Sequence, residues 1–106
     1  MLERLTRLRY LNISRNAFEV WPPCIGGMAG LIELRASDNA LAALPESIGR
    51  LARLRELHLR NNRLISLPEE IASLHELRLL DLRWVATLEA PGWLSALEAR
   101  GCMVYR

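Results

Sequence analysis

The feature that most constrains the fold of this chain is a repeat that recurs at a fixed step along the whole sequence. The step is marked by prolines (Pro22, Pro45, Pro68 and Pro91), by asparagines (Asn16, Asn39 and Asn62) and by apolar residues (Leu5, Met28, Leu51, Leu74 and Leu97). Self-similarity at a fixed period of this length is typical of proteins built by stacking copies of one small unit. The sequence therefore predicts an elongated stack.

The repeats account for the whole chain as one predicted domain, residues 1–106. Three full repeats span 5–27, 28–50 and 51–73, a degraded fourth spans 74–96, and a partial capping repeat spans 97–106. The third repeat places apolar residues at Leu51, Leu54, Leu57, Leu59, Leu64, Leu67 and Ile71. One unit cannot bury such a set alone, so about three or more units must stack.

The segment from Leu54 to Leu64 fits the pattern L-x-x-L-x-L-x-x-N-x-L and resembles the leucine-rich repeat. The following Leu67-Pro68-Glu-Glu-Ile71 resembles the L-P-x-x-I ending of the 23-residue subclass, as in scribble-like and Ras-scaffold proteins and many bacterial repeat proteins. The resemblance implies an α/β leucine-rich-repeat solenoid, with short parallel strands on the concave side and helical turns on the convex side. It implies no particular partner.

Physical chemistry gives each repeated position a role. Alternating Leu-x-Leu places leucines inward and their neighbours outward on a short strand. An asparagine at a fixed offset can bond backbone groups where the chain leaves the strand, and a proline can start the helical turn at little cost.

The two ends of the chain depart from the pattern in different ways. At the start, Leu8, Leu11 and Ile13 are predicted to form an uncapped apolar edge that only residues 1–4 could cover. Two interpretations remain: the chain is a fragment of a longer solenoid, or two copies form a homodimer through this edge.

The other end is predicted to be a cap. Val85 replaces the repeated asparagine, residues 91–100 read as an amphipathic helix, and Gly101 ends it. Residues 102–106 then read as a closing strand with Met103 and Tyr105 facing inward.

Outward strand positions should align in columns across the concave face, where such solenoids usually bind partners. The predicted columns are Tyr10, Glu33, Glu56, Leu79 and Cys102; Asn12, Arg35, His58, Asp81 and Val104; Ser14, Ser37, Arg60, Arg83 and Arg106; and Arg15, Asp38, Asn61 and Trp84. The candidate partner-binding residues are Tyr10, Arg35, Glu56, His58, Arg60, Asp81, Arg83 and Trp84.

The column of Arg60, Arg83 and Arg106 is the sharpest of these features. Adjacent guanidinium groups repel each other, so the column needs anions beside it. Either Asp81 and Glu56 supply them, or an acidic surface of a partner protein does. A net charge of +2 and the interleaved carboxylates argue against nucleic acid as the partner.

Trp84 has two readings. As an exposed aromatic beside arginines it fits a binding hot spot, whereas a shift of register would tuck its ring over the missing asparagine ladder.

Catalysis and metal binding are not expected. Ser37, His58 and Asp81 fall on adjacent strands, but an open sheet offers no oxyanion hole, so we expect only a surface pair between His58 and Asp81. Cys24, His58, His75 and Cys102 should not converge on one ion, and Cys24 and Cys102 lie too many repeats apart for a disulfide. The chain is thus predicted to be no enzyme and to hold no cofactor.

These patterns predict a protein-interaction module that binds through its concave face. The alternative is a targeting or regulatory segment of a larger bacterial kinase or translocated effector. No apolar run is long enough to span a membrane, and the charged start argues against a cleaved signal, so we expect a cytoplasmic protein, with delivery to a host cell by an uncleaved signal left open. All 14 basic residues are arginine, which is typical of GC-rich bacterial genomes.

Overall fold

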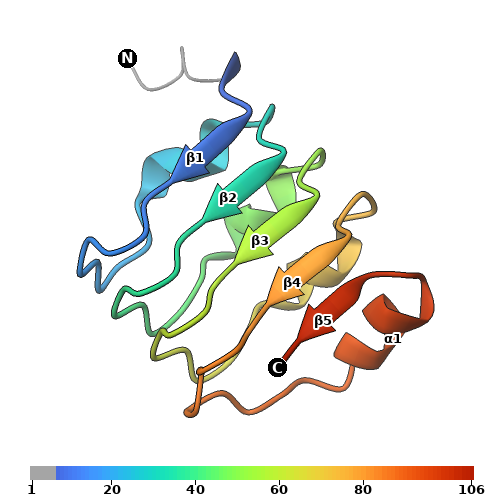
Figure 1. Ribbon diagram of the computed structural model, residues 1–106. Coiled ribbons are helices and arrows are strands. Elements are labelled where there is room, and N and C mark those ends of the chain that lie inside the picture. The colour runs from blue at the N-terminus through green and yellow to red at the C-terminus, as the bar shows by residue number, and fades with distance from the viewer. Residues whose placement is uncertain (1–6) are drawn as a thin grey trace.

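Five short parallel strands lie side by side in one open sheet in the computed structural model, which describes residues 7–106. The strands follow the order of the sequence, as Figure 1 shows: β1 (Tyr10–Asn12), β2 (Glu33–Arg35), β3 (Glu56–His58), β4 (Leu79–Asp81) and β5 (Met103–Tyr105). This arrangement is the predicted leucine-rich-repeat solenoid. Because every connection between neighbouring strands is a parallel crossover, each strand must be followed by a return segment on one side of the sheet.

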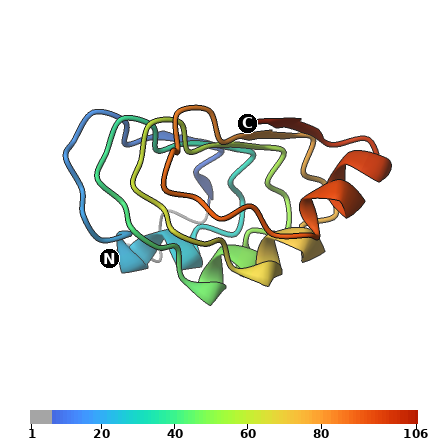
Figure 2. The same cartoon turned by 90° about the horizontal axis from the view of Figure 1, so that it is seen from below.

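The return segments form a second layer opposite the sheet (Figure 2). Three of them contain 3-10 helices, η2 (Pro23–Gly27), η3 (Glu46–Arg50) and η4 (Glu69–Ser73), and the last contains the α-helix α1 (Leu94–Ala99). Prolines at 22, 45 and 68 occupy the position before each 3-10 helix. A proline there fixes its own φ, and its missing N–H costs little because helix starts lack partners for this group.

The core lies between the two layers and is almost entirely aliphatic. Leu34, Leu57 and Leu80, the central residues of β2, β3 and β4, are directly paired in register and fully buried. Trp21 is buried in the same cluster, at the position that Leu44 and Leu67 occupy in the next two repeats. Every strand therefore presents its central residue to the core and its two end residues to the outside.

The predicted asparagine ladder is present. Asn62 donates hydrogen bonds to the carbonyl oxygens of Ala36 and Leu59 (2.9 and 3.0 Å), and its own oxygen accepts one from the backbone N–H of Leu41 (3.1 Å). Asn39 makes the corresponding contacts one repeat earlier, to Ile13 among others. These side chains satisfy backbone groups that the turn after each strand leaves without partners.

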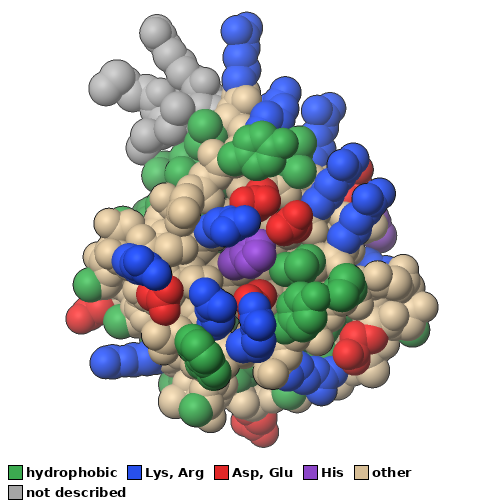
Figure 3. All heavy atoms as spheres, in the orientation of Figure 1, with side chains coloured by type: hydrophobic (Ala, Val, Ile, Leu, Met, Phe, Trp, Pro, Cys, Tyr) green, Lys and Arg blue, Asp and Glu red, His purple; other side chains and the backbone are tan. Residues whose placement is uncertain are grey.

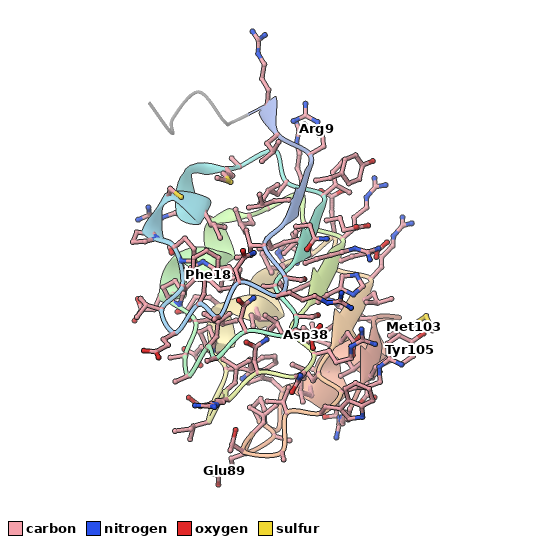
Figure 4. All side chains as sticks on the ribbon, turned by 60° about the vertical axis from the view of Figure 1, so that its left-hand side comes forward. Arg9, Phe18, Asp38, Glu89, Met103 and Tyr105 are labelled. Carbon is pink, nitrogen blue, oxygen red and sulfur yellow. The ribbon has the colours of Figure 1, made fainter. Side chains whose placement is uncertain are left out.

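The closing strand differs from the prediction. Met103 pairs with Leu79 and Tyr105 with Asp81, one residue later than the step that relates the earlier strands. A shift of one residue exchanges the two faces of a strand. Met103 (54% exposed) and Tyr105 therefore point outward, and Cys102 is buried. Figure 4 shows Met103 and Tyr105 projecting on the same side of the sheet.

The physical cause of this shift is α1. An α-helix rises less per residue than a 3-10 helix, so it uses more residues to cover the same return path. The chain therefore needs one residue more from Pro91 to Met103 than it needs from Pro68 to Leu79. Gly101, with a φ of +100°, makes the turn after the helix in a conformation that suits glycine alone.

The N-terminal edge is partly apolar, as predicted. Leu8, Leu11 and Ile13 are half-buried and pack against the core cluster. The predicted cover, residues 1–4, lies outside the described residues. The homodimer through this edge stays a prediction.

Candidate functional site on the concave face

The face of the sheet that points away from the helices, here called the concave face, carries the outward residues of the strands. The structure aligns them in two columns: Tyr10, Glu33, Glu56, Leu79 and Met103, and then Asn12, Arg35, His58, Asp81 and Tyr105. Charged side chains of both signs alternate over this face around a central histidine, with apolar side chains among them (Figure 3). The surface is therefore mixed in character.

Most of the predicted site residues meet in one shallow hollow of about 440 Å³. Arg35, His58, Arg60, Asp81 and Arg83 line it. The other predicted residues lie around it: Tyr10 (65% exposed) and Glu56 lie in the first column, and Trp84 is the third residue after the end of β4.

In each of the three middle repeats, an acidic side chain of the strand contacts a basic side chain two residues later. Glu33 accepts a hydrogen bond from Arg35 (2.6 Å), and Oε1 of Glu56 lies 3.0 Å from Nε2 of His58. Side chains two residues apart on a strand share a face, so this spacing brings opposite charges together. Glu33 and Arg35 thus neutralise each other locally, and Glu56 lies within hydrogen-bonding distance of His58.

The tightest pair is that of Asp81 and Arg83. Both carboxylate oxygens of Asp81 accept hydrogen bonds from the Arg83 side chain, at 3.0 and 2.9 Å, and the Arg83 backbone N–H adds a third at 3.1 Å. Burial raises the pKa of Asp81, but these hydrogen bonds and the charges of Arg83 and Arg60 together lower it by more, so the pKa lies below its ordinary value of 3.8. Asp81 is therefore held as an anion, and both of its carboxylate oxygens already accept hydrogen bonds from Arg83.

One prediction about this face was wrong, and another holds in part. His58 contacts Glu56, whereas Asp81 is bound by Arg83, so the expected pair of His58 with Asp81 does not form. Of the two acids expected beside the arginine column, Asp81 does bind Arg83, but Glu56 contacts His58.

The arginine column itself is shorter than predicted. Arg106 follows β5 in the shifted register, and its guanidinium pairs with Glu98 of α1 at 2.9 Å. The column therefore reduces to Arg60 and Arg83. For the same reason the placement of Cys102 and Val104 on the concave face was wrong: Cys102 is buried and Val104 packs partly against the core.

Arg60 differs from the other arginines of the hollow. Its Nε is shielded from solvent and has no hydrogen-bond partner among the described residues. Its guanidinium carbon lies 5.4 Å from the centre of the Trp84 ring, which is the geometry of a cation–π contact. Arg35 and Arg83, by contrast, each bind a carboxylate.

The sequence left two interpretations of Trp84 open, and the structure agrees with the one in which its side chain is exposed. Its side chain is 72% exposed, and the neighbouring Val85 is buried at the position of the missing asparagine. Trp84 also has a φ of +59°. The other residues of its column have similar φ values, from 56° to 61°: Arg15, Asp38 and Asn61. Left-handed backbone suits Asn and Asp but is costly for a bulky aromatic residue.

A second, apolar hollow of about 270 Å³ lies on the other side of this site. It is lined by Leu82, Trp84, Val85, Ala86, Leu88, Ala90, Leu94 and Arg106. Trp84 is therefore in contact with both Arg60 and an apolar hollow.

Sequence reasoning missed Tyr105 as a residue of the site. The guanidinium carbon of Arg83 lies 5.1 Å from the centre of the Tyr105 ring, and Tyr105 lines the main hollow. The extra residue between Pro91 and the closing strand was the available signal, but its effect depends on how α1 is wound.

The structure also places the residues considered for other chemistry. Within residues 7–106, no group of three or more His, Cys, Asp or Glu side chains is arranged to hold a metal ion. Cys24 and Cys102 are free thiols, and burial raises the pKa of Cys102. In the part of the chain that the structure describes, none of the helices has the length and apolar character needed to cross a membrane.

Comparison with known proteins supports the same fold. A family model for the leucine rich repeat matches residues 7–28 and 53–74. A solved leucine-rich-repeat protein of Leptospira interrogans is similar over 93% of this chain, with 33% identity and a TM-score of 0.81. This chain spans 25% of the length of that protein. No curated protein matches it significantly. The chain thus has the fold of a leucine-rich-repeat solenoid, and two of its segments match the leucine rich repeat model.

Proposed function

We propose that the chain is a protein-interaction module that binds a partner protein through its concave face, without catalysis. Leucine-rich-repeat domains generally mediate contacts between proteins, which is the general basis of the proposal. The observation that carries it for this face is Trp84, a large aromatic side chain that is exposed and held in a left-handed turn.

Two properties of Trp84 favour binding. An exposed Trp beside arginines matches the residue types that dominate the free energy of protein–protein contacts. A bulky residue in left-handed backbone costs about 1 kcal/mol, and such conformations cluster at functional sites. Tyr10, on the opposite end of the face, adds a second exposed aromatic side chain.

The charge pattern favours a protein over a polyanion. Strand by strand, Glu33 and Arg35, Glu56 and His58, and Asp81 and Arg83 pair with each other. A nucleic acid needs a basic track that neutralises many phosphates, and these carboxylates would repel it. A mixed surface with aromatic side chains suits a protein surface.

The test is partner capture by the intact chain and by a variant in which Arg60, Arg83 and Trp84 are replaced together by Gln, Gln and Asn. All three side chains contribute to the concave face, and none belongs to the aliphatic core. Arg83 is the charge partner of the buried Asp81, so Gln is used at position 83 because its amide can still donate a hydrogen bond to that carboxylate, and the variant should fold with reduced stability. We expect it to lose the partners that the unchanged chain retains, with circular dichroism showing unchanged secondary structure.

One control makes the result decisive. Ile65, an exposed residue outside both hollows, should tolerate replacement by Ala with capture intact. If the triple variant captures the same partners at the same level, the binding site lies elsewhere on the solenoid and the proposal is wrong.

A further inference from the structure

The main hollow contains one guanidinium group that no carboxylate of the described residues neutralises by direct contact. Arg35 and Arg83 bind Glu33 and Asp81, and Arg15 lies 3.9 Å from Asp38. Arg60 alone among these arginines contacts an aromatic ring in place of an acid. One positive charge of the concave face is therefore available to a ligand.

The Arg60 side chain is also held in a fixed position before a ligand binds. Its Nε is buried and the Trp84 ring packs against the guanidinium, so the side chain is already fixed before a partner arrives. A pre-ordered side chain loses little conformational entropy on binding. Only Nε of the three guanidinium nitrogens is shielded without a partner, which leaves the two terminal nitrogens for a bidentate contact from solvent.

The ligand of such a group is a single carboxylate. A planar guanidinium matches the two oxygens of a carboxylate, and the contact is charge-assisted. A polyanion is disfavoured because Asp81 and Asp38 line the same hollow. Asp81 acts on Arg60 through its charge but makes no direct contact with it, since both Asp81 oxygens are held by the Arg83 side chain.

The apolar hollow beside Trp84 defines what lies next to that carboxylate. Trp84 lines this hollow and contacts Arg60, so the two subsites are separated by little more than one indole ring. Apart from Trp84 and Arg106, the lining side chains are aliphatic, including Leu82, Leu88 and Leu94, and the volume of about 270 Å³ accepts one leucine-sized side chain. We propose that Arg60 and Trp84 bind a segment of the partner protein in which an acidic residue lies within two residues of a leucine-sized apolar residue. This inference rests on the proposed function.

The test uses short synthetic peptides and the full chain labelled with ¹⁵N. The probes are N-acetylated, C-amidated tripeptides containing Leu, Ala and Glu in both orders, with matched peptides in which Gln replaces Glu or Ala replaces Leu. Binding is followed by the nuclear magnetic resonance signals of the Arg60 Nε–H and the Trp84 indole N–H. The Glu/Gln pair removes only the charge, so it needs no variant protein.

We expect one Leu/Glu order to shift both signals and to bind about tenfold more tightly than its Gln match, since a charge-assisted contact is stronger than a neutral one. The Ala match should bind more weakly than the Leu peptide by a similar factor. In an Arg60→Gln chain, the preference for Glu over Gln should disappear. An Arg53→Gln chain, which loses the same charge at an exposed position outside the hollow, should keep it.

Equal affinity for the Glu and Gln peptides, a preference that survives in Arg60→Gln, or failure of every peptide to move the Arg60 signal would each overturn the inference. The capture experiment separates this outcome from failure of the proposed function. If the triple variant loses its partner while the peptides fail, the concave face binds a partner of different chemistry. If the triple variant keeps its partner, the proposed function fails by itself.

Discussion

Residues 7–73 and residues 74–106 bury the same kind of aliphatic core, but they join their strands by different means. In the first region, Asn39 and Asn62 connect neighbouring turns through side-chain amides. In the second, Thr87 donates its hydroxyl to the carbonyl oxygen of Leu64, and the Arg100 guanidinium binds the carbonyl oxygens of Ala72 and Leu74. Backbone groups that need hydrogen-bond partners are thus satisfied by a repeated asparagine in the first region and by individual side chains of different types in the second.

This difference teaches that a leucine pattern and a surface pattern are determined separately. The core positions continue into the second region, where Leu80, Leu94 and Leu97 are buried. The surface positions do not, because one additional residue places Met103 and Tyr105 outside. An apolar core tolerates a change in the length of the segment that connects two strands. The identity of the exposed side chains does not tolerate it, because one added residue in that segment exchanges the two faces of the next strand.

The largest expected effect comes from Asn62, which is one of the repeated asparagines of the first region. Replacing Asn62 by Ala removes a buried amide and leaves the backbone groups of Ala36, Leu59 and Leu41 without it, so the free energy of unfolding should fall by about 3 kcal/mol. Asn16→Ala is the matched control: Asn16 is exposed, so water can replace it, and the loss should be about 1 kcal/mol. Urea unfolding measures both, and equal losses would contradict a buried ladder.

The register of β5 is tested by placing one charged residue on each of its two faces. Val104→Glu should lower the free energy of unfolding by about 2 kcal/mol, because Val104 packs partly against the core. Met103→Glu should change it by less than about 0.5 kcal/mol, because that side chain is exposed. Thermal unfolding of the two variants decides between the registers, since the step that relates β1 to β4 would require the opposite order if it continued into β5.

The smallest expected effect concerns the left-handed turn at Trp84. Trp84→Asn should raise the free energy of unfolding by about 0.5 kcal/mol, since Asn accepts this backbone more readily and the gain exceeds the lost contact with Arg60. The reciprocal Asn61→Trp should lower it by about 1 kcal/mol and also removes the bond to Asp38. Denaturant unfolding checks the pair. A clear loss of stability in Trp84→Asn would mean that the ring is there to support the fold.

Much of the fold could be predicted because leucine positions, prolines and asparagines each act over short distances. The fixed step of the repeat places Leu34 against Leu57 whatever their side-chain conformations are. The register of β5 could not be predicted in this way, since it depends on how many residues α1 uses to cover its return path.

The candidate site was predictable only in part, for a different reason. The columns predicted the outward residues of β1 to β4, but Arg60 becomes the free group only because Asp81 accepts its hydrogen bonds from Arg83 of its own repeat. Choices between partners at similar distances depend on side-chain geometry, which spacing does not contain.

The pairing of charges within single repeats has a consequence for how such a chain can change over generations. Because Glu33 with Arg35, and Asp81 with Arg83, balance their charges locally, neither pair depends on a neighbouring repeat for neutrality. Unequal recombination that copies or removes one whole repeat in frame would therefore keep each of these two pairs together. The site around Arg60 and Trp84, by contrast, spans two repeats, so it persists only where both of those repeats are kept.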